Sequence, residues 1–199
     1  LTDLRPSVED APRRADAGAP EILVLPGSRR SEIVHLMAVF GAAVALVART
    51  LPAARFVLPA VEHLRPLIAA QAALWPVQPE IVAGGPAKLA AFRRARAALA
   101  ASGTVTLELA LSGVPMVAAY RGADWEAFLA KRLVKLPSVI LPNLVIGRSA
   151  VPEFLQSGAQ PGPLAEALLG LIADGPARAA QLDAFAAVEA AMRQAGPSP

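Results

Sequence analysis

Short apolar runs alternate along the chain with longer segments in which apolar residues recur every three or four positions. Segment 31–52 is the clearest periodic one, because Ile33, Phe40 and Val47 fall on one face of a helix. The short runs predict strands at 21–28, 54–60, 79–85, 97–102 and 114–120, with a last short strand or extended segment at 138–144. The periodic segments predict helices at 31–52, 63–75, 87–95, 104–113, 124–135, 163–174 and 177–194.

Strands separated by helices of this length predict a parallel sheet covered on both faces, which is a doubly wound, Rossmann-like α/β domain. We expect that domain over 21–160 and a pair of C-terminal helices over 161–199. Residues 1–20 are polar and contain prolines, which is typical of a linker. Ligands of such sheets bind outside the carboxyl ends of the strands. Two turns at those ends, 26–30 and 102–104, are therefore candidate binding elements.

The amino-acid composition predicts a large hydrophobic core and shows a small excess of basic residues. Of 199 residues, 55% are hydrophobic and 18% are charged, and the absence of cysteine excludes disulfides and Cys-ligated metals. A net charge of +3 favours anionic partners such as phosphates or anionic lipid. No basic run is long enough to indicate nucleic-acid binding, and we expect the densest cluster, Arg93, Arg94 and Arg96, to lie on a solvated helix face.

Nothing in the pattern indicates secretion or membrane insertion. Residues 1–20 lack the basic start, apolar centre and small-residue cleavage site of a signal peptide. The apolar run 33–48 contains His35 and is shorter than the roughly 20 residues of a spanning helix. We interpret it as a buried helix and expect a cytoplasmic protein.

The turn Ser102-Gly103-Thr104 opens a predicted helix and has two possible roles. A helix N-terminus attracts phosphate, Gly103 allows close approach of a ligand, and Thr104 adds a hydroxyl donor. The alternative is an ordinary N-cap made by Ser102 or Thr104. Neither residue makes a capping box, because Val105 and Leu107 stand three positions later.

Glu108 is a lone carboxylate in an apolar segment. It lies four residues after Thr104, so both side chains project from one face of the helix. About 5.4 Å along the axis from a phosphate site, a carboxylate can accept hydrogen bonds from ribose hydroxyls. It can equally be a solvent-facing acid, and periodicity does not separate the two.

The first turn offers Ser28 and Arg29 after a strand that ends in Pro26-Gly27. A guanidinium there can neutralise a diphosphate leaving group, although a surface arginine pair is the simpler explanation of Arg29 and Arg30. The chain has no D-x-D acidic clamp, no G-x-S-x-G elbow, and only two distant histidines. We therefore expect no metal and no cofactor.

Four segments together resemble the carboxyl half of the lipid-A-disaccharide synthase family. They are LPGSRRSEI (25–33), ASGTVTLELALSGVPMV (101–117), FLAKRLVKLP (128–137) and LPNLVIGRSAVPEFLQ (141–156). The resemblance runs from about 21 to 156, and its order and spacing match the family. It implies the C-terminal lobe of a two-lobed GT-B glycosyltransferase, in which this lobe holds UDP.

The resemblance also implies the reaction and its partners. The family transfers an acylated glucosamine with inversion from UDP-2,3-diacylglucosamine to lipid X, forming the β-1,6 disaccharide of lipid A and releasing UDP. It works peripherally at the cytoplasmic face of the inner membrane, and the full enzyme can be a homo-oligomer. The implied site residues are Ser28, Arg29, Gly103 and Thr104 for the diphosphate, Glu108 for the ribose, and Asn143, Arg148 and Glu153 in the donor site or cleft.

The chain departs from the family pattern in two places. Family members carry an amino lobe before the LPGSRR strand, where the general base is expected. We therefore expect this chain to be a fragment or a shortened product, with residues 1–20 as a linker or a remnant of that lobe. Ser149 stands where members commonly have Glu. Other UDP-sugar enzymes of the GT-B type, such as the lipid II-forming transferase or a UDP-sugar epimerase, and a non-catalytic UDP-sugar-binding module remain alternatives. The segment 124–135, apolar on one side and basic around the other, is either a membrane-surface helix or a helix packed on the sheet.

Overall fold

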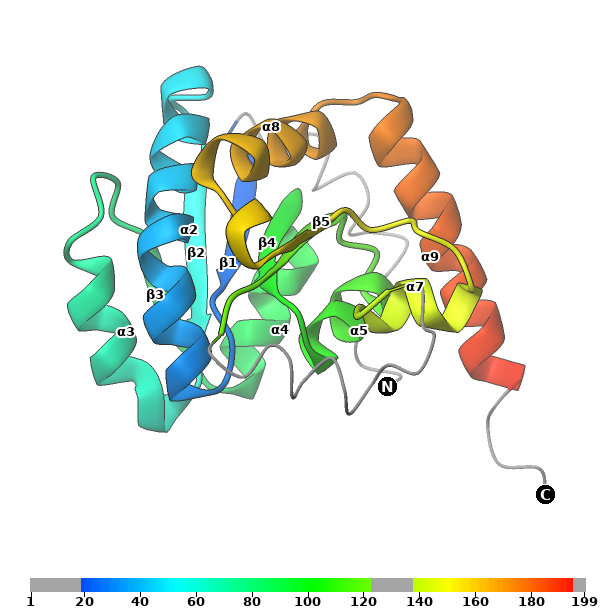
Figure 1. Cartoon of the computed structure of the whole chain (residues 1–199), viewed down its shortest axis with the longest axis horizontal. Helices are drawn as coiled ribbons and strands as arrows, with labels where there is room; N and C mark the ends of the chain where they lie inside the picture. Colours follow the sequence, from blue (N-terminus) through cyan, green and yellow to red (C-terminus); the bar gives the residue numbers. More distant parts are fainter. Residues whose placement is uncertain (1–18, 123–137, 195–199) are drawn as a thin grey trace.

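Parallel strands form one sheet in the order β3-β2-β1-β4-β5-β6, in a computed structural model that describes residues 19–122 and 138–194. This confirms the doubly wound α/β fold (Figure 1). The strands are β1 (Glu21–Leu25), β2 (Arg55–Ala60), β3 (Glu80–Ala83), β4 (Ala97–Ala101), β5 (Met116–Tyr120) and β6 (Glu153–Leu155). The helical elements are α2 (Arg30–Thr50), η2 (Glu62–Leu64), α3 (Arg65–Ala72), α4 (Gly85–Arg94), α5 (Thr104–Leu111), α7 (Leu141–Ile146), η3 (Gln156–Gly158), α8 (Pro161–Ile172) and α9 (Pro176–Gln194).

Two hydrophobic cores lie on opposite faces of the sheet. Successive strand residues point to opposite faces, so Ile22 and Val24 pack against α2, α3 and α8, while Leu23 and Leu25 pack against α4, α5 and α9. The strands are buried on both faces, which explains their continuous apolar runs. Figure 1 shows these two helical layers on either side of the sheet.

The order of the strands creates a switch point between β1 and β4. Both strands pair in parallel, with Val24 opposite Leu99, but their following connections lead in opposite directions along the sheet. The carboxyl ends of these two strands therefore border a crevice of the kind in which α/β proteins bind ligands.

Helix α2 is the apolar helix expected from 31–52. Among the described helices it has the length and composition to cross a membrane, yet 56% of its apolar window is buried inside the protein. Its apolar face packs on the sheet, with Ile33, Phe40 and Val47 fully buried. The interpretation of this run as a core helix is confirmed.

The prediction of a strand or extended segment at 138–144 was wrong. Residues Leu141–Ile146 form α7, which has a proline in its first turn and ends at Gly147 in the left-handed region with φ +67°. The sixth strand is instead β6, and it pairs with β5 through only three residues. A strand this short carries no period-2 signal that the sequence could reveal.

Arg96 was wrongly expected on a solvated helix face. It follows α4 and is buried, with 8% of its surface exposed, where its Nε donates to the Ile172 carbonyl at 2.8 Å and its Nη2 to Asp174 at 2.6 Å. Arg178 donates to the Arg96 carbonyl at 2.7 Å. These bonds attach the junction between α8 and α9 to the sheet. Arg93 and Arg94 are exposed as expected.

Candidate functional site

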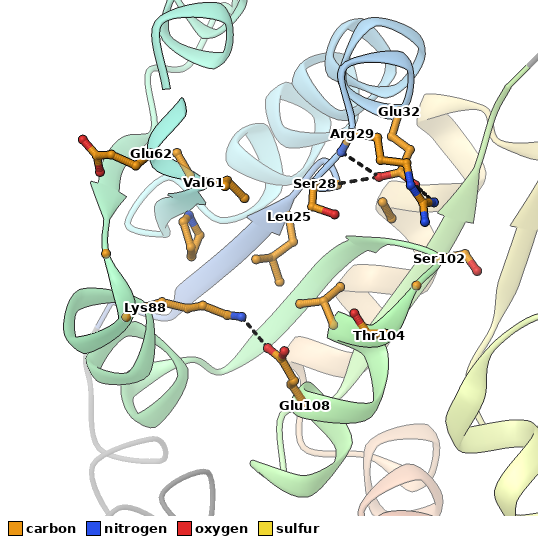
Figure 2. A pocket seen from close by; sticks show the side chains of 18 residues that line it. Leu25, Ser28, Arg29, Glu32, Val61, Glu62, Lys88, Ser102, Thr104 and Glu108 are labelled. Atoms are coloured by element: carbon orange, nitrogen blue, oxygen red, sulfur yellow. Dashed lines mark hydrogen bonds and ion pairs between the residues drawn. The ribbon is translucent and has the colours of Figure 1, made fainter. Parts of the chain in front are cut away.

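A cavity of about 440 Å³ lies at the carboxyl ends of β1, β2, β3 and β4 (Figure 2). The cavity spans the switch point, and both candidate turns, 26–30 and 102–104, contribute residues to its lining. Its walls combine apolar residues at the strand ends with polar side chains from α2, α4 and α5. The lining residues are Leu25, Gly27, Ser28, Arg29, Glu32, Pro59, Ala60, Val61, Glu62, Gly84, Gly85, Lys88, Ala101, Ser102, Gly103, Thr104, Val105 and Glu108.

The turn between β1 and α2 folds around the carboxylate of Glu32. Oε2 accepts the backbone amides of Ser28 at 3.0 Å and Arg29 at 3.2 Å, and Oε1 accepts Nη1 of Arg29 at 3.0 Å. Gly27 has φ +111°, and a Cβ there would lie 2.3 Å from Oε2. This turn therefore requires glycine, and it presents the Ser28 hydroxyl and the Arg29 guanidinium to the cavity, since its amides are already bonded.

The turn between β4 and α5 presents a helix N-terminus. Gly103 is the N-cap, and among the described residues no side chain caps this helix. The hydroxyl of Ser102 donates to the Val139 carbonyl at 3.4 Å instead. The ordinary N-cap alternative is therefore wrong. A Cβ on Gly103 would meet no described atom within 4 Å, so this turn leaves room for a ligand beside the first amides of α5.

Glu108 lines the cavity one turn into α5, so the purely solvent-facing alternative does not hold. Its Oε2 accepts a hydrogen bond from Lys88 of α4, and the two side chains point toward each other across the cavity wall (Figure 2). Both are about one-third exposed, at 32% for Glu108 and 39% for Lys88. The role of Glu108 as a ribose ligand remains a prediction.

Asn143, Arg148 and Glu153 do not line the cavity. Asn143 is fully buried, and its Oδ1 accepts the amides of Ala150 and Val151 at 2.9 Å. Arg148 is exposed.

Glu153 accepts bonds from the Ser138 hydroxyl, from the Val139 amide at 3.2 Å and from the Asn143 side chain at 2.8 Å. Asn143 and Glu153 thus hold segment 138–153 together, and this segment contacts the turn 102–104 through the hydrogen bond from the Ser102 hydroxyl to the Val139 carbonyl. Their assignment to the donor site remains a prediction.

Sequence reasoning missed several cavity residues, chiefly Glu32, Glu62 and Lys88. The signal available for Glu32 was its place three residues after the N-cap Arg29 of α2, where an acid often bonds the N-terminal amides. The signal for Lys88 was the pair Gly84-Gly85 at a strand end, which marks a third turn at the ligand-binding edge. A single Lys or Glu carries no such meaning until the sheet brings the strand ends together.

The fold and the position of the cavity define the class of domain, which is a doubly wound, Rossmann-like lobe of the GT-B fold with a cavity at its switch point. The crystal structure of MurG from Acinetobacter baumannii superposes on 94% of the chain and 50% of its own length, with a TM-score of 0.58 at 17% identity. The C-terminal domain of a glycosyl transferase group 1 family protein from Francisella tularensis covers 95% of both chains, with a TM-score of 0.58 at 12% identity. These identities show the fold alone.

Sequence comparison gives the family. The family model described as lipid-A-disaccharide synthetase matches residues 9–196, and the chain belongs to this family. The lipid-A-disaccharide synthase of Rhodopseudomonas palustris (strain BisB18) is 51% identical over 100% of the chain and 50% of that protein. The corresponding protein of Nitrobacter hamburgensis is 52% identical over 98% of the chain and 49% of that protein. The chain therefore spans about half the length of the curated relatives it matches.

Proposed function

We propose that this chain is the donor-binding lobe of a lipid-A-disaccharide synthase. The proposed enzyme transfers an acylated glucosamine from UDP-2,3-diacylglucosamine to lipid X and releases UDP. One observation carries the proposal: Ser28, Arg29, Gly103, Thr104 and Glu108, which the family resemblance assigns to UDP, all line one cavity at the switch point of the sheet.

In the proposed complex the diphosphate lies between the Arg29 guanidinium and the N-terminus of α5. Arg29 and the helix dipole then stabilise the negative charge that develops on UDP as the bond to the sugar C1 breaks. The Ser28 and Thr104 hydroxyls donate to phosphate oxygens. Glu108, one turn further along α5, accepts hydrogen bonds from the ribose hydroxyls.

The remaining parts of the reaction are proposed for the full enzyme. A general base in the amino lobe takes the proton of the acceptor hydroxyl as the β-1,6 bond forms with inversion. The enzyme works at the cytoplasmic face of the inner membrane, where its lipid-borne substrates reside, and it can be a homo-oligomer. Segment 124–135, which we expect to be either a membrane-surface helix or a helix packed on the sheet, lies outside the described residues.

Titration calorimetry of the chain with UDP tests the proposal. We expect Glu108→Gln to lower the affinity for UDP by roughly ten-fold or more, because charge-assisted hydrogen bonds contribute about 1.5–3 kcal/mol each. Glu166→Gln is the matched control, since Glu166 is an exposed acid on α8 outside the cavity. Equal affinities of the parent and Glu108→Gln would contradict the ribose role of Glu108.

A further inference from the structure

Lys88 is a cavity residue whose place is fixed by the start of α4. Gly84, with φ +87°, is the N-cap, and Pro86 lies in the first turn of the helix. The backbone amide of Lys88 donates to the Gly84 carbonyl at 3.0 Å. This first turn of α4 directs the lysine across the cavity toward α5 (Figure 2).

Two contacts hold the ammonium group of Lys88. Nζ donates to Oε2 of Glu108, and it lies 5.3 Å from the centre of the Phe92 ring, which is fully buried beneath it. A cation near an aromatic face is attracted by the ring quadrupole. Glu108 is thereby joined to a second helix, and its carboxylate is not free to rotate on α5 alone.

The other charged residues of the cavity wall show why the pairing of Lys88 with Glu108 matters for binding an anion. Among the described lining residues, Glu32, Glu62 and Glu108 are acidic, while Arg29 and Lys88 are basic. Arg29 bonds Glu32, so Lys88 is the partner that compensates Glu108. Without it, an uncompensated carboxylate would stand one helical turn from the expected position of a diphosphate, and like charges in a partly desolvated site repel.

The geometry of the pair leaves the carboxylate able to bind. An ionised carboxylate offers about four lone-pair sites on its two oxygens. Lys88 engages Oε2, so acceptor capacity remains on Oε1 and on the second lone pair of Oε2. Two vicinal ribose hydroxyls need two acceptor sites, which a carboxylate fixed in this way supplies.

We propose that Lys88 is a positioning residue for recognition of the ribose of a nucleoside diphosphate. It holds the Glu108 carboxylate toward the cavity and compensates its charge, so that an anionic ligand can approach while its sugar hydroxyls are bound. This inference rests on the proposed function, because it takes UDP as the ligand of the cavity.

The test measures the affinity of the chain for UDP and for 2′-deoxy-UDP by titration calorimetry. The parent should prefer UDP by roughly ten-fold, as expected for loss of a charge-assisted hydrogen bond. In Lys88→Met the affinity for UDP should fall about ten-fold and the preference for UDP should shrink to about two-fold. Lys88→Arg should keep most of the preference, since it retains the cation. Combining Lys88→Met with Glu108→Gln should cause little further loss.

Arg49→Met is the matched control, because Arg49 is exposed in the last turn of α2, outside the cavity, and its replacement removes the same unit of charge. It should leave both affinities unchanged. Equal losses for UDP and 2′-deoxy-UDP in Lys88→Met would overturn the proposal, because they would reduce Lys88 to a general attractor of phosphate. An unchanged Lys88→Met would overturn it as well. If the parent fails to bind UDP, the proposed function itself is overturned. If the parent binds UDP and Lys88→Met binds UDP and 2′-deoxy-UDP with the same affinities as the parent, only this inference is overturned.

Discussion

At the scale of single residues, two glycines allow close packing because neither carries a side chain. Gly27 makes room for the Glu32 carboxylate in the first turn of the site. Gly41, in the middle of α2, makes room for the indole of Trp75, because an added Cβ would lie 2.5 Å from Cδ1. Gly41 is buried, and Trp75 is buried against it. In the sequence, Gly41 is simply a glycine within an apolar helix.

We expect Gly41→Ala to destabilise the chain by about 1 kcal/mol. Overpacking a core costs typically 1–3 kcal/mol, and the better helix propensity of alanine offsets up to about 1 kcal/mol of that. Urea unfolding followed by circular dichroism measures the change. Gly170→Ala is the control, since Gly170 lies exposed in α8 with no described atom within 4 Å of its added Cβ. It should stabilise by about 0.5–1 kcal/mol. Equal shifts in both variants would contradict the tight fit of Trp75 on α2.

At the scale of elements, arginines attach the α8–α9 junction to the amino end of β4, the end of that strand that faces away from the cavity. Arg96 binds the carbonyl of Ile172 and the carboxylate of Asp174, and Arg178 binds the carbonyls of Arg96 and Leu171. The last carbonyls of α8, which have no partner within the helix, are thus satisfied by guanidinium groups. The hydrogen bond from Arg96, together with its charge, lowers the pKa of Asp174 below its ordinary value.

This junction predicts a defined acid sensitivity. Because the pKa of Asp174 is lower in the folded chain than in the unfolded chain, the ion pair stabilises the fold above about pH 3.8, and that contribution is lost as the pH falls through the folded value. We expect the parent to be more stable than Asp174→Asn near pH 6, and the gap to close below pH 4. Thermal unfolding of both proteins across this range measures it. A gap that stays constant with pH would show that the carboxylate charge does not contribute.

At the scale of the whole molecule, the described residues contain one sheet with helices on both faces and a cavity at its switch point. In the described residues, helices pack against both faces of this sheet and bury a core on each, so we expect the chain to fold by itself. The chain also spans about half the length of its curated relatives. The acceptor contacts and the general base are proposed for the amino lobe.

We therefore expect the 199-residue chain to unfold cooperatively and to bind UDP, yet to form no lipid A disaccharide. Adding the amino-terminal half of a curated relative as a separate polypeptide should restore some transfer, measured with radiolabelled donor and thin-layer chromatography. The relative's amino half alone is the control. Disaccharide formation by the chain alone would contradict the proposal that the acceptor contacts and the general base belong to the amino lobe.

The sequence by itself determined the alternation of strands and helices, because burial on both faces of a parallel sheet demands continuous apolar runs and because helices covering the sheet demand a period near 3.6. It also marked the two turns that follow strand ends as candidate binding elements, because a parallel sheet brings the carboxyl ends of its strands together. The family resemblance then assigned Ser28, Arg29, Gly103, Thr104 and Glu108 to UDP. These features depend on neighbours close in sequence or on a general rule of the fold.

Only the tertiary structure decided which distant groups meet. Lys88 and Glu108 lie 20 residues apart, and Arg96 and Asp174 lie 78 apart, so no local pattern joins them. Strand β6 exists because β5 provides a partner edge, and Asn143 and Glu153 hydrogen-bond to each other within segment 138–153 and are not among the residues that line the cavity. Hydrogen bonds and ion pairs act over a few ångströms of space. A pattern of residues that are neighbours in the sequence therefore does not reveal which distant residues folding brings within that range.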